Sequence, residues 1–247
     1  MRQRLDQALV DRGLVETRAR ARGLILRGLV SVDGKTAAKP GELIGEASAI
    51  AVAEAAGRYV SFGADKLRAA LDHLQGEFNP EGRIALDVGA STGGFTDVLL
   101  SRGAAKVYAV DVGRGQLHLR LRSDPRVVSL EATDARALSR ALVPDPISAV
   151  VADTSFISLT KVLEPALALT VPGAWLIALI KPQFEVGPAS VGSGGIVRDN
   201  AERARARAIV TDWIAAHPGW RVDDVIVWPG LEGRSNEEYL IGAHRRV

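Results

Sequence analysis

The 247-residue sequence contains no cysteine and only 4 histidines. Without thiols the chain can form no disulfide, no thiolate zinc site and no covalent thiol intermediate. So few histidines also make a histidine-rich metal site unexpected. These absences predict an activity that needs no metal.

Long apolar segments are missing as well. The longest uninterrupted apolar run, residues 174–180, is far shorter than the roughly 20 residues that span a bilayer. The first residues are charged and lack the apolar core of a secretory signal. We therefore expect a cytoplasmic protein with no membrane partner.

Charge is nearly balanced overall but unevenly distributed along the chain. Residues 1–40 hold 9 Lys and Arg against 4 Asp and Glu, a net of +5, whereas residues 41–247 hold 22 against 25, a net of −3. An alanine-rich stretch at residues 47–57 follows the basic segment. The sequence therefore predicts a junction near residues 57–62, with a first domain and linker over 1–60 and a second domain over 61–247.

The first segment has the pattern of two short helices followed by a small β element. Leu5 and Leu9 share one helical face, and Thr17 is a candidate N-cap for the second helix. Asp33 and Gly34 favour a tight hairpin turn, because both residue types adopt positive φ angles.

Arginines are concentrated on this segment, and five of them are candidates for RNA contact. They are Arg4, Arg18, Arg20, Arg22 and Arg27. Four lie within ten positions with only Glu16 nearby to neutralise them, and guanidinium pairs bidentately with phosphate. The alternative is a solvated helix face, which is the commoner role of a charge run. We favour RNA binding.

Strand and helix patterns alternate from residue 83 onward. Strands are predicted at 83–88, 106–111, 127–130, 147–152 and 174–180, and helices near 95–101, 158–169 and 199–216. This alternation indicates an α/β fold with a parallel sheet covered on both faces. Two last strands, 221–228 and 238–244, are joined only by a loop, which predicts an antiparallel pair ending the sheet. That is the architecture of a Rossmann-like class I methyltransferase.

A glycine-rich turn follows the first predicted strand and has three possible uses. Its candidate ligand-binding residues are Asp87, Gly89, Ser91, Gly93, Gly94 and Phe95. A dinucleotide fingerprint would need glycine in place of Ser91. A nucleophile elbow matches residues 89–93, with His217 and His244 in triad order, but elbows normally follow several strands. The third use is binding of S-adenosylmethionine.

Acidic residues at three predicted strand ends favour that third use. Asp87 can meet the amino-acid end of the cofactor, Asp111 the two ribose hydroxyls, and Asp134 the adenine edge. Open parallel sheets bind ligands at the carboxyl ends of their strands, so the three side chains should converge. Each acid alone could be a helix cap or a loop residue.

Two more charged residues end the next strands. The chain has only 6 lysines, yet Lys181 closes its most apolar strand. A lysine there must be paired or have its pKa lowered. Asp153, at the neighbouring strand end, is the candidate partner and also a candidate cofactor-binding residue. A structural ion pair at the rim of the sheet would give the same pattern.

The sequence blocks around these residues resemble one family closely. They are residues 87–95, 111–117, 153–159, 180–187, 194–199 and 236–240, together with the S4-like blocks at 4–10, 17–21 and 28–35. They are similar to the TlyA family, whose members carry an S4-type RNA-binding domain and an FtsJ-like methyltransferase domain. The resemblance implies S-adenosylmethionine-dependent 2′-O-methylation of cytidine in 16S or 23S ribosomal RNA, with ribosomal RNA or subunits as partner and no DNA.

The resemblance also implies a catalytic tetrad. Its members here would be Lys66, Asp153, Lys181 and Glu238, with Glu237 as a competitor for the last place. Lys181 would deprotonate or orient the 2′-hydroxyl. The sequence departs from the family at Phe62, Ala64, Asp134 and Ser235.

Two competing functions belong to other classes. A membrane-active hemolysin, as the family's other name suggests, needs an exposed apolar helix or a membrane span, and the sequence has neither pattern. A non-catalytic ribosome-assembly factor would keep the fold without the chemistry, which an intact tetrad disfavours. The missing cysteine excludes the thiol-dependent route of some base-carbon RNA methyltransferases and leaves lysine-assisted transfer to oxygen.

Overall fold

The computed structural model describes residues 2–53, 59–228 and 236–246, which leaves Ser235 outside the described residues. Two compact units make up the chain, Met1–Phe62 and Gly63–Val247. The division falls at the end of the stretch in which the sequence predicts a junction. Each unit has its own hydrophobic core.

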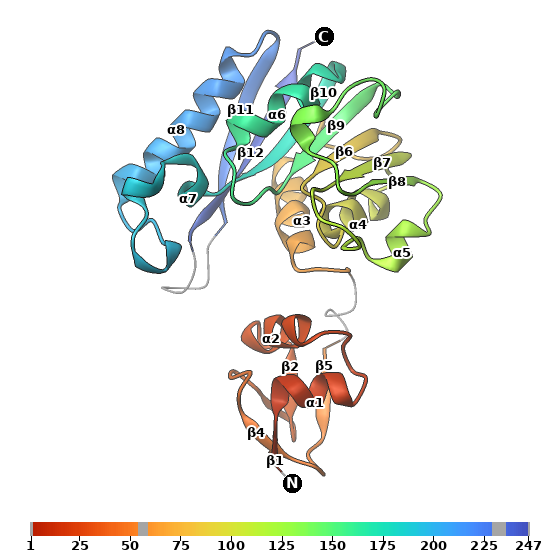
Figure 1. Cartoon of the computed structure of the whole chain (residues 1–247), viewed down its shortest axis with the longest axis vertical. Coiled ribbons are helices and arrows are strands. Elements are labelled where there is room, and N and C mark those ends of the chain that lie inside the picture. Colours follow the sequence, from red (N-terminus) through yellow and green to blue (C-terminus); the bar gives the residue numbers. More distant parts are fainter. Residues whose placement is uncertain (1, 54–58, 229–235, 247) are drawn as a thin grey trace. The chain divides into compact units, whose positions relative to one another are not determined.

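The N-terminal unit combines two helices with two small antiparallel sheets (Figure 1). Its helices are α1 (Leu5–Asp11) and α2 (Arg18–Leu26). Its strands are β1 (Arg2–Arg4), β2 (Val30–Val32), β3 (Lys35–Thr36), β4 (Leu43–Gly45) and β5 (Ile50–Val52). β1 pairs with β4, while β2 lies between β3 and β5.

Local signals in the sequence explain most of this unit. The Thr17 hydroxyl accepts a hydrogen bond from the Arg20 amide at 3.2 Å, which makes it the predicted N-cap of α2. Asp33 and Gly34 have φ angles of 50° and 79°, as a primed hairpin turn requires. The sequence missed β1, β4 and β5 because strands of three residues carry almost no periodic signal.

The C-terminal unit is built on a seven-stranded sheet with the order β11-β12-β10-β9-β6-β7-β8. Its strands are β6 (Ile84–Val88), β7 (Lys106–Val110), β8 (Val127–Leu130), β9 (Ile147–Ala152), β10 (Thr170–Ile180), β11 (Trp220–Trp228) and β12 (Glu238–Arg245). Strands β8, β7, β6, β9 and β10 are parallel, and β12 is antiparallel to both β10 and β11. The predicted α/β fold with a terminal antiparallel pair is confirmed.

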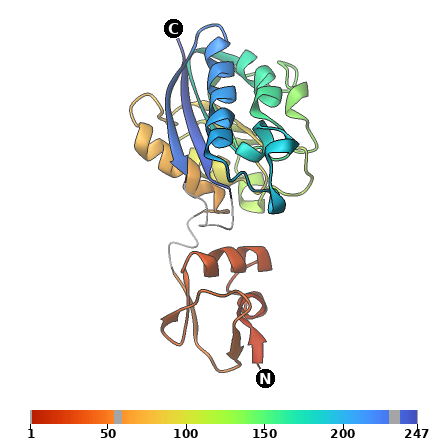
Figure 2. The ribbon, with the colours of Figure 1, turned by 90° about the vertical axis from the view of Figure 1, so that its left-hand side faces the viewer.

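Helices cover both faces of this sheet. On one face, α3 (Gly63–Leu74) packs against α4 (Gly94–Ser101) and β12. On the other face, α6 (Leu159–Ala168) and α8 (Asn200–Ala216) contact each other and the sheet. Figure 2 shows α3 on one side of the two last strands and α8 on the other. The short helix α5 (Leu119–Arg122) lies beside β8, and α7 (Pro182–Glu185) directly follows β10.

The sheet topology brings distant charged residues to one edge. Val88 is paired with Ala152 in register, so the segments that follow β6 and β9 leave the sheet side by side. Because β12 runs antiparallel to β10, Tyr239 pairs with Ile180. The first residue of β12, Glu238, therefore lies beside Lys181, the residue that follows the end of β10.

Candidate active site

Four charged side chains form a cluster at this edge of the sheet. Lys181 Nζ lies 2.5 Å from Asp153 Oδ1 and donates a hydrogen bond of 2.9 Å to the Ser155 hydroxyl. Lys66, one turn into α3, lies 2.6 Å from Glu238 and 4.0 Å from Asp153. The geometry brings together all four members of the predicted tetrad.

Partial burial makes these ion pairs stronger than pairs on an open surface. The four side chains are 11–21% exposed, so water screens their charges incompletely. The two ammonium and two carboxylate groups balance each other. Asp153 bridges the two lysines, at 2.5 Å from Lys181 and 4.0 Å from Lys66.

The competing acid Glu237 points to different partners. Its carboxylate accepts a hydrogen bond from the Tyr239 hydroxyl and lies 3.9 Å from Arg203. Glu238, not Glu237, therefore completes the cluster. The sequence alone could not separate these neighbours, because consecutive residues of a strand point to opposite faces and the register decides which one faces Lys66.

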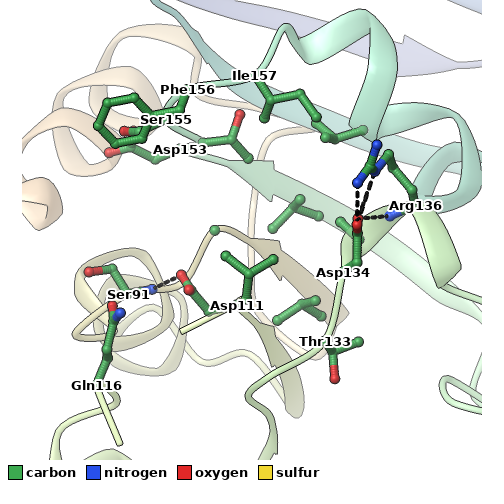
Figure 3. A pocket seen from close by; sticks show the side chains of 17 residues that line it. Ser91, Asp111, Gln116, Thr133, Asp134, Arg136, Asp153, Ser155, Phe156 and Ile157 are labelled. Carbon is green, nitrogen blue, oxygen red and sulfur yellow. Dashed lines mark hydrogen bonds and ion pairs between the residues drawn. The ribbon is translucent and has the colours of Figure 1, made fainter. Parts of the chain in front are cut away.

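A cavity of about 400 Å³ opens beside the cluster (Figure 3). Five of the predicted ligand-binding residues line it, namely Gly89, Ser91, Asp111, Asp134 and Asp153. Gly93, Gly94 and Phe95 are buried at the start of α4 and do not line it, and neither does the buried Asp87. The volume is in the range of small-molecule sites.

Asp111 is fixed by the glycine turn that it faces. One carboxylate oxygen accepts a hydrogen bond from the Ser91 amide at 2.8 Å, and the other accepts one from the Gly113 amide at 2.7 Å. An ionised carboxylate offers about four lone-pair sites, so two remain for a ligand. The arrangement suits a pair of adjacent hydroxyl groups.

Asp134 lies on another wall of the cavity, paired with Arg136 (Figure 3). The Arg136 guanidinium approaches to 2.6 Å, and its side-chain hydrogen bonds lower the pKa of Asp134. Asp134 also accepts the Arg136 amide at 2.9 Å. Its carboxylate is thus held in place and ionised.

Asp87 is fully buried beneath the glycine turn. One oxygen accepts hydrogen bonds from the Thr96 amide, at 2.9 Å, and the Thr96 hydroxyl, at 2.7 Å. The other oxygen has no hydrogen-bond partner within the described part of the chain. Burial raises the pKa of Asp87 to about 7, and the nearby charges of Asp153 and Asp111 add to the rise. A cationic group of a ligand would satisfy this carboxylate.

The glycine turn itself is packed tightly against the end of β9. Gly89 has a φ of +84°, and a Cβ there would lie 2.6 Å from the Asp153 carbonyl oxygen. Glycine is required at this position.

The two histidines of the hydrolase alternative are bonded elsewhere, His217 to the Trp213 carbonyl and His244 to Asp223. Neither orients a base toward Ser91.

Sequence reasoning missed two residues of the loop that follows β9. Phe156 lines the cavity, is 91% exposed and has a φ of +67°. Ser155 lines the cavity too and holds the Lys181 amine. Their place directly after the predicted catalytic Asp153 was the available signal.

The five arginines predicted to bind RNA differ in their surroundings. Arg4 and Arg18 lie 2.9 Å and 3.2 Å from the buried Asp6, although about half of each side chain stays exposed. Arg20 donates to the carbonyls of Val60 and Tyr59. The other two also lie on or next to α2: Arg27 stacks on the Phe62 ring at 4.1 Å, and Arg22 is exposed.

Family models match both units. An S4 domain covers residues 3–50 and an FtsJ-like methyltransferase covers residues 59–245. Fold and site thus define an FtsJ-like methyltransferase with an N-terminal S4 domain.

Full-length relatives identify the family more narrowly. The chain is 45% identical over 241 residues to the 16S/23S rRNA (cytidine-2'-O)-methyltransferase TlyA of Mycobacterium tuberculosis, covering 97% of this chain and 89% of the relative. It is 40% identical to Hemolysin A of Brachyspira hyodysenteriae over 82% of this chain and 83% of that protein. A solved structure of a hemolysin-named protein from Streptococcus thermophilus has 36% identity and a TM-score of 0.74, covering 99% and 89% of the two chains. The chain belongs to the TlyA family.

The hemolysin name of some relatives raises the question of a membrane. Among residues 2–53, 59–228 and 236–246, no helix is long and apolar enough to cross a bilayer. No observation at the site favours a membrane activity over methyl transfer.

Proposed function

We propose that the protein transfers a methyl group from S-adenosylmethionine to the 2′-hydroxyl of a cytidine in 16S or 23S ribosomal RNA. The observation that carries the proposal is the cluster of Lys66, Asp153, Lys181 and Glu238, of which Asp153 lines the cavity. The named activity of the M. tuberculosis relative supports the substrate and the acceptor atom. An RNA substrate of this kind would place the enzyme in the cytoplasm.

Three acids fit S-adenosylmethionine, two that line the cavity and one, Asp87, that is buried beneath the glycine turn. Asp111 has lone pairs left for the ribose hydroxyls, and Asp134 offers a fixed carboxylate to the adenine amino group. The unpartnered oxygen of Asp87 suits the ammonium of the amino-acid end. The bound molecule would supply a methyl group activated by a positively charged sulfur.

Lys181 is the group best placed to act on the acceptor hydroxyl. Asp153 and Ser155, which both line the cavity, fix its amine and leave one N–H for a substrate hydroxyl. Lys66, held by Glu238, places a second positive charge near Asp153 and balances the site. Lys181 then orients the 2′-hydroxyl through an N–H of its ammonium group. Only as a neutral amine could it take the hydroxyl proton as the oxygen attacks.

Phe156 supplies a surface for the target base. Its ring is exposed beside Asp153 and Ser155 (Figure 3). RNA-modifying enzymes reach a sugar inside a structured RNA by unstacking its nucleotide, and aromatic side chains stack on bases released in this way. Stacking on Phe156 would hold the nucleotide with its ribose toward Lys181.

The N-terminal S4 domain would supply affinity for ribosomal RNA. Its candidate contacts remain Arg4, Arg18, Arg20, Arg22 and Arg27. Arginine contacts to phosphate position a protein on RNA without reading its sequence. Selection of the nucleotide would then fall to the methyltransferase domain.

The test is transfer of a radiolabelled methyl group to isolated small and large ribosomal subunits, followed by mapping of the modified nucleotide. Replacing Lys181→Ala should lower transfer by about 10²–10⁴-fold and leave cofactor affinity within about twofold, because the lysine acts on the acceptor. The matched control is Lys161→Ala, which removes an exposed lysine of α6. Full activity of the Lys181 variant, or label on a base instead of a ribose, would contradict the proposal.

A further inference from the structure

The one-turn helix α7 makes three separate contacts with the loop that carries Phe156. Lys181, its N-cap, donates to Ser155 at 2.9 Å. The Phe184 ring lies 5.3 Å from the Phe156 ring at an angle of 49°. Glu185 accepts the Leu159 amide at 2.9 Å and the Ser158 hydroxyl at 2.5 Å. Lys181, Phe184 and Glu185 thus contact this segment in chain order.

Glu185 has surroundings that a purely structural surface acid would not have. Its carboxylate is partly buried, and the two groups that donate to it, the Ser158 hydroxyl and the Leu159 amide, are neutral. Burial raises the pKa of Glu185, while the hydrogen bonds from Ser158 and Leu159 lower it. A carboxylate placed at the first amide of α6 also interacts favourably with the helix dipole. Glu185 therefore fixes the end of the loop at the start of α6.

The loop needs such a fixed end. Phe156 has a φ of +67°, a left-handed conformation that costs free energy for a residue with a side chain. The ring is 91% exposed, so burial in the protein does not hold it. The loop is restrained by Lys181 at Ser155, Phe184 at Phe156, and Glu185 at Ser158 and Leu159.

We infer that Glu185 is a positioning residue for methyl transfer, which holds residues 154–157 so that Ser155 and Phe156 face the acceptor nucleotide. The inference rests on the proposed function. Glu185 does not touch the cavity, and it acts through the loop that does. It links the end of β10, where Lys181 is, to the loop after β9, where Asp153 begins.

The experiment compares Glu185→Gln with wild type and with Glu164→Gln, which removes an exposed acid of α6. Glutamine keeps the shape of the side chain but loses its charge and one acceptor oxygen. Either the Ser158 hydroxyl or the Leu159 amide then faces the NH₂ group of the glutamine and loses its hydrogen-bond acceptor. We expect kcat to fall about 10- to 100-fold, the KM for RNA to rise, and cofactor affinity and the unfolding temperature to stay near wild type. The control should match wild type in every measurement.

A double-mutant cycle separates positioning from a general structural role. If Glu185 acts through the loop, adding Glu185→Gln to Phe156→Ala should cost about twofold or less in kcat. Amide exchange of a peptide covering residues 155–161 should quicken in the Gln variant and nowhere else. Wild-type kcat in the Gln variant, multiplicative losses in the cycle, or a large fall in unfolding temperature with faster exchange across the whole domain would each overturn the inference.

The same measurements distinguish this inference from the proposed function. If the wild-type protein transfers no methyl group to either subunit, the proposed function fails. The exchange measurement needs no substrate and still decides whether Glu185 holds the loop. Local quickening in the Gln variant alone would support the restraint, and unchanged exchange would refute it.

Discussion

Two aspartates, one in each unit, are both fully buried but lie in opposite electrostatic surroundings. In α1, Asp6 accepts hydrogen bonds from Arg4 and Arg18, and the Arg4 hydrogen bonds above all lower its pKa to about 2. At the end of β6, Asp87 is bonded to Thr96, and burial raises its pKa to about 7. A buried acid with its own cations stabilises the fold, whereas one without them is suited to a cationic ligand.

The two acids therefore change stability with pH in opposite directions. Asp6 has a folded pKa below the ordinary value of 3.8, so its stabilisation is present above pH 4 and is lost as the pH falls toward 2. Asp87 has a folded pKa above 3.8, so its ionisation destabilises the ligand-free protein as the pH rises from about 4 through 7. Only the second window overlaps physiological pH.

The largest effect should come from removing the acid that has its own counter-ions. Asp6→Ala removes the shared partner of Arg4 and Arg18. Because both arginines are about half exposed and stay hydrated, the cost lies below that of a fully buried pair, at about 3 kcal/mol. We expect amides of α1 and α2 to exchange much faster in the full-length variant, with the methyltransferase domain unaffected. Asp11→Ala, on the exposed end of the same helix, is the control. Equal amide exchange of α1 and α2 in the two variants would show that Asp6 does not stabilise the N-terminal unit.

The sequence located the residues of the candidate site better than it predicted their conformation. Asp87, Asp111, Asp153 and Lys181 could be located because strand periodicity and the parallel topology together assign residues to one edge of the sheet. Helix α3 escaped prediction although Leu67 and Leu71 mark its buried face. Conformation also escaped it, since nothing in the sequence indicates a left-handed Phe156.

The sequence also did not show which charged side chains are paired with other groups of the protein. A count of arginines in residues 1–40 gives the charge but not its use, because partners such as Asp6 and the Val60 carbonyl are fixed only by the tertiary fold. The choice between Glu237 and Glu238 depended in the same way on the register of β12.

A smaller effect, and one of opposite sign on stability, is expected at Asp87. Asp87→Asn keeps an acceptor for Thr96 but removes the charge that the ligand ammonium needs. A hydrogen bond to a charged group contributes about 1.5–3 kcal/mol, so cofactor affinity should fall about 10- to 100-fold. The ligand-free variant should unfold at a higher temperature than wild type at pH 8, because the costly ionisation is gone. Calorimetric titration and thermal unfolding measure the two quantities.

The pH dependence of binding supplies the control for Asp87. If the ligand binds only the ionised carboxylate, wild-type affinity should rise about fivefold between pH 6 and pH 7, since the pKa is about 7. The Asn variant should show no such rise. A variant with wild-type affinity, or with the same pH profile as wild type, would mean that Asp87 shapes the turn and does not meet the ligand.

The smallest effect extends the comparison to the arginines. Arg22 is exposed on α2, and within the described residues its guanidinium makes no hydrogen bond or ion pair, unlike Arg4 and Arg18. Arg22→Ala should weaken binding to ribosomal RNA a few-fold, lower the slope of log affinity against log salt by about 1, and leave the unfolding temperature unchanged. Arg22→Lys keeps the charge and should keep the slope. If the Ala variant retains the wild-type slope, the absence of an internal partner does not identify the arginines that contact phosphate. Arg4 and Arg18 then become the better candidates, because they are half exposed although they are paired with Asp6.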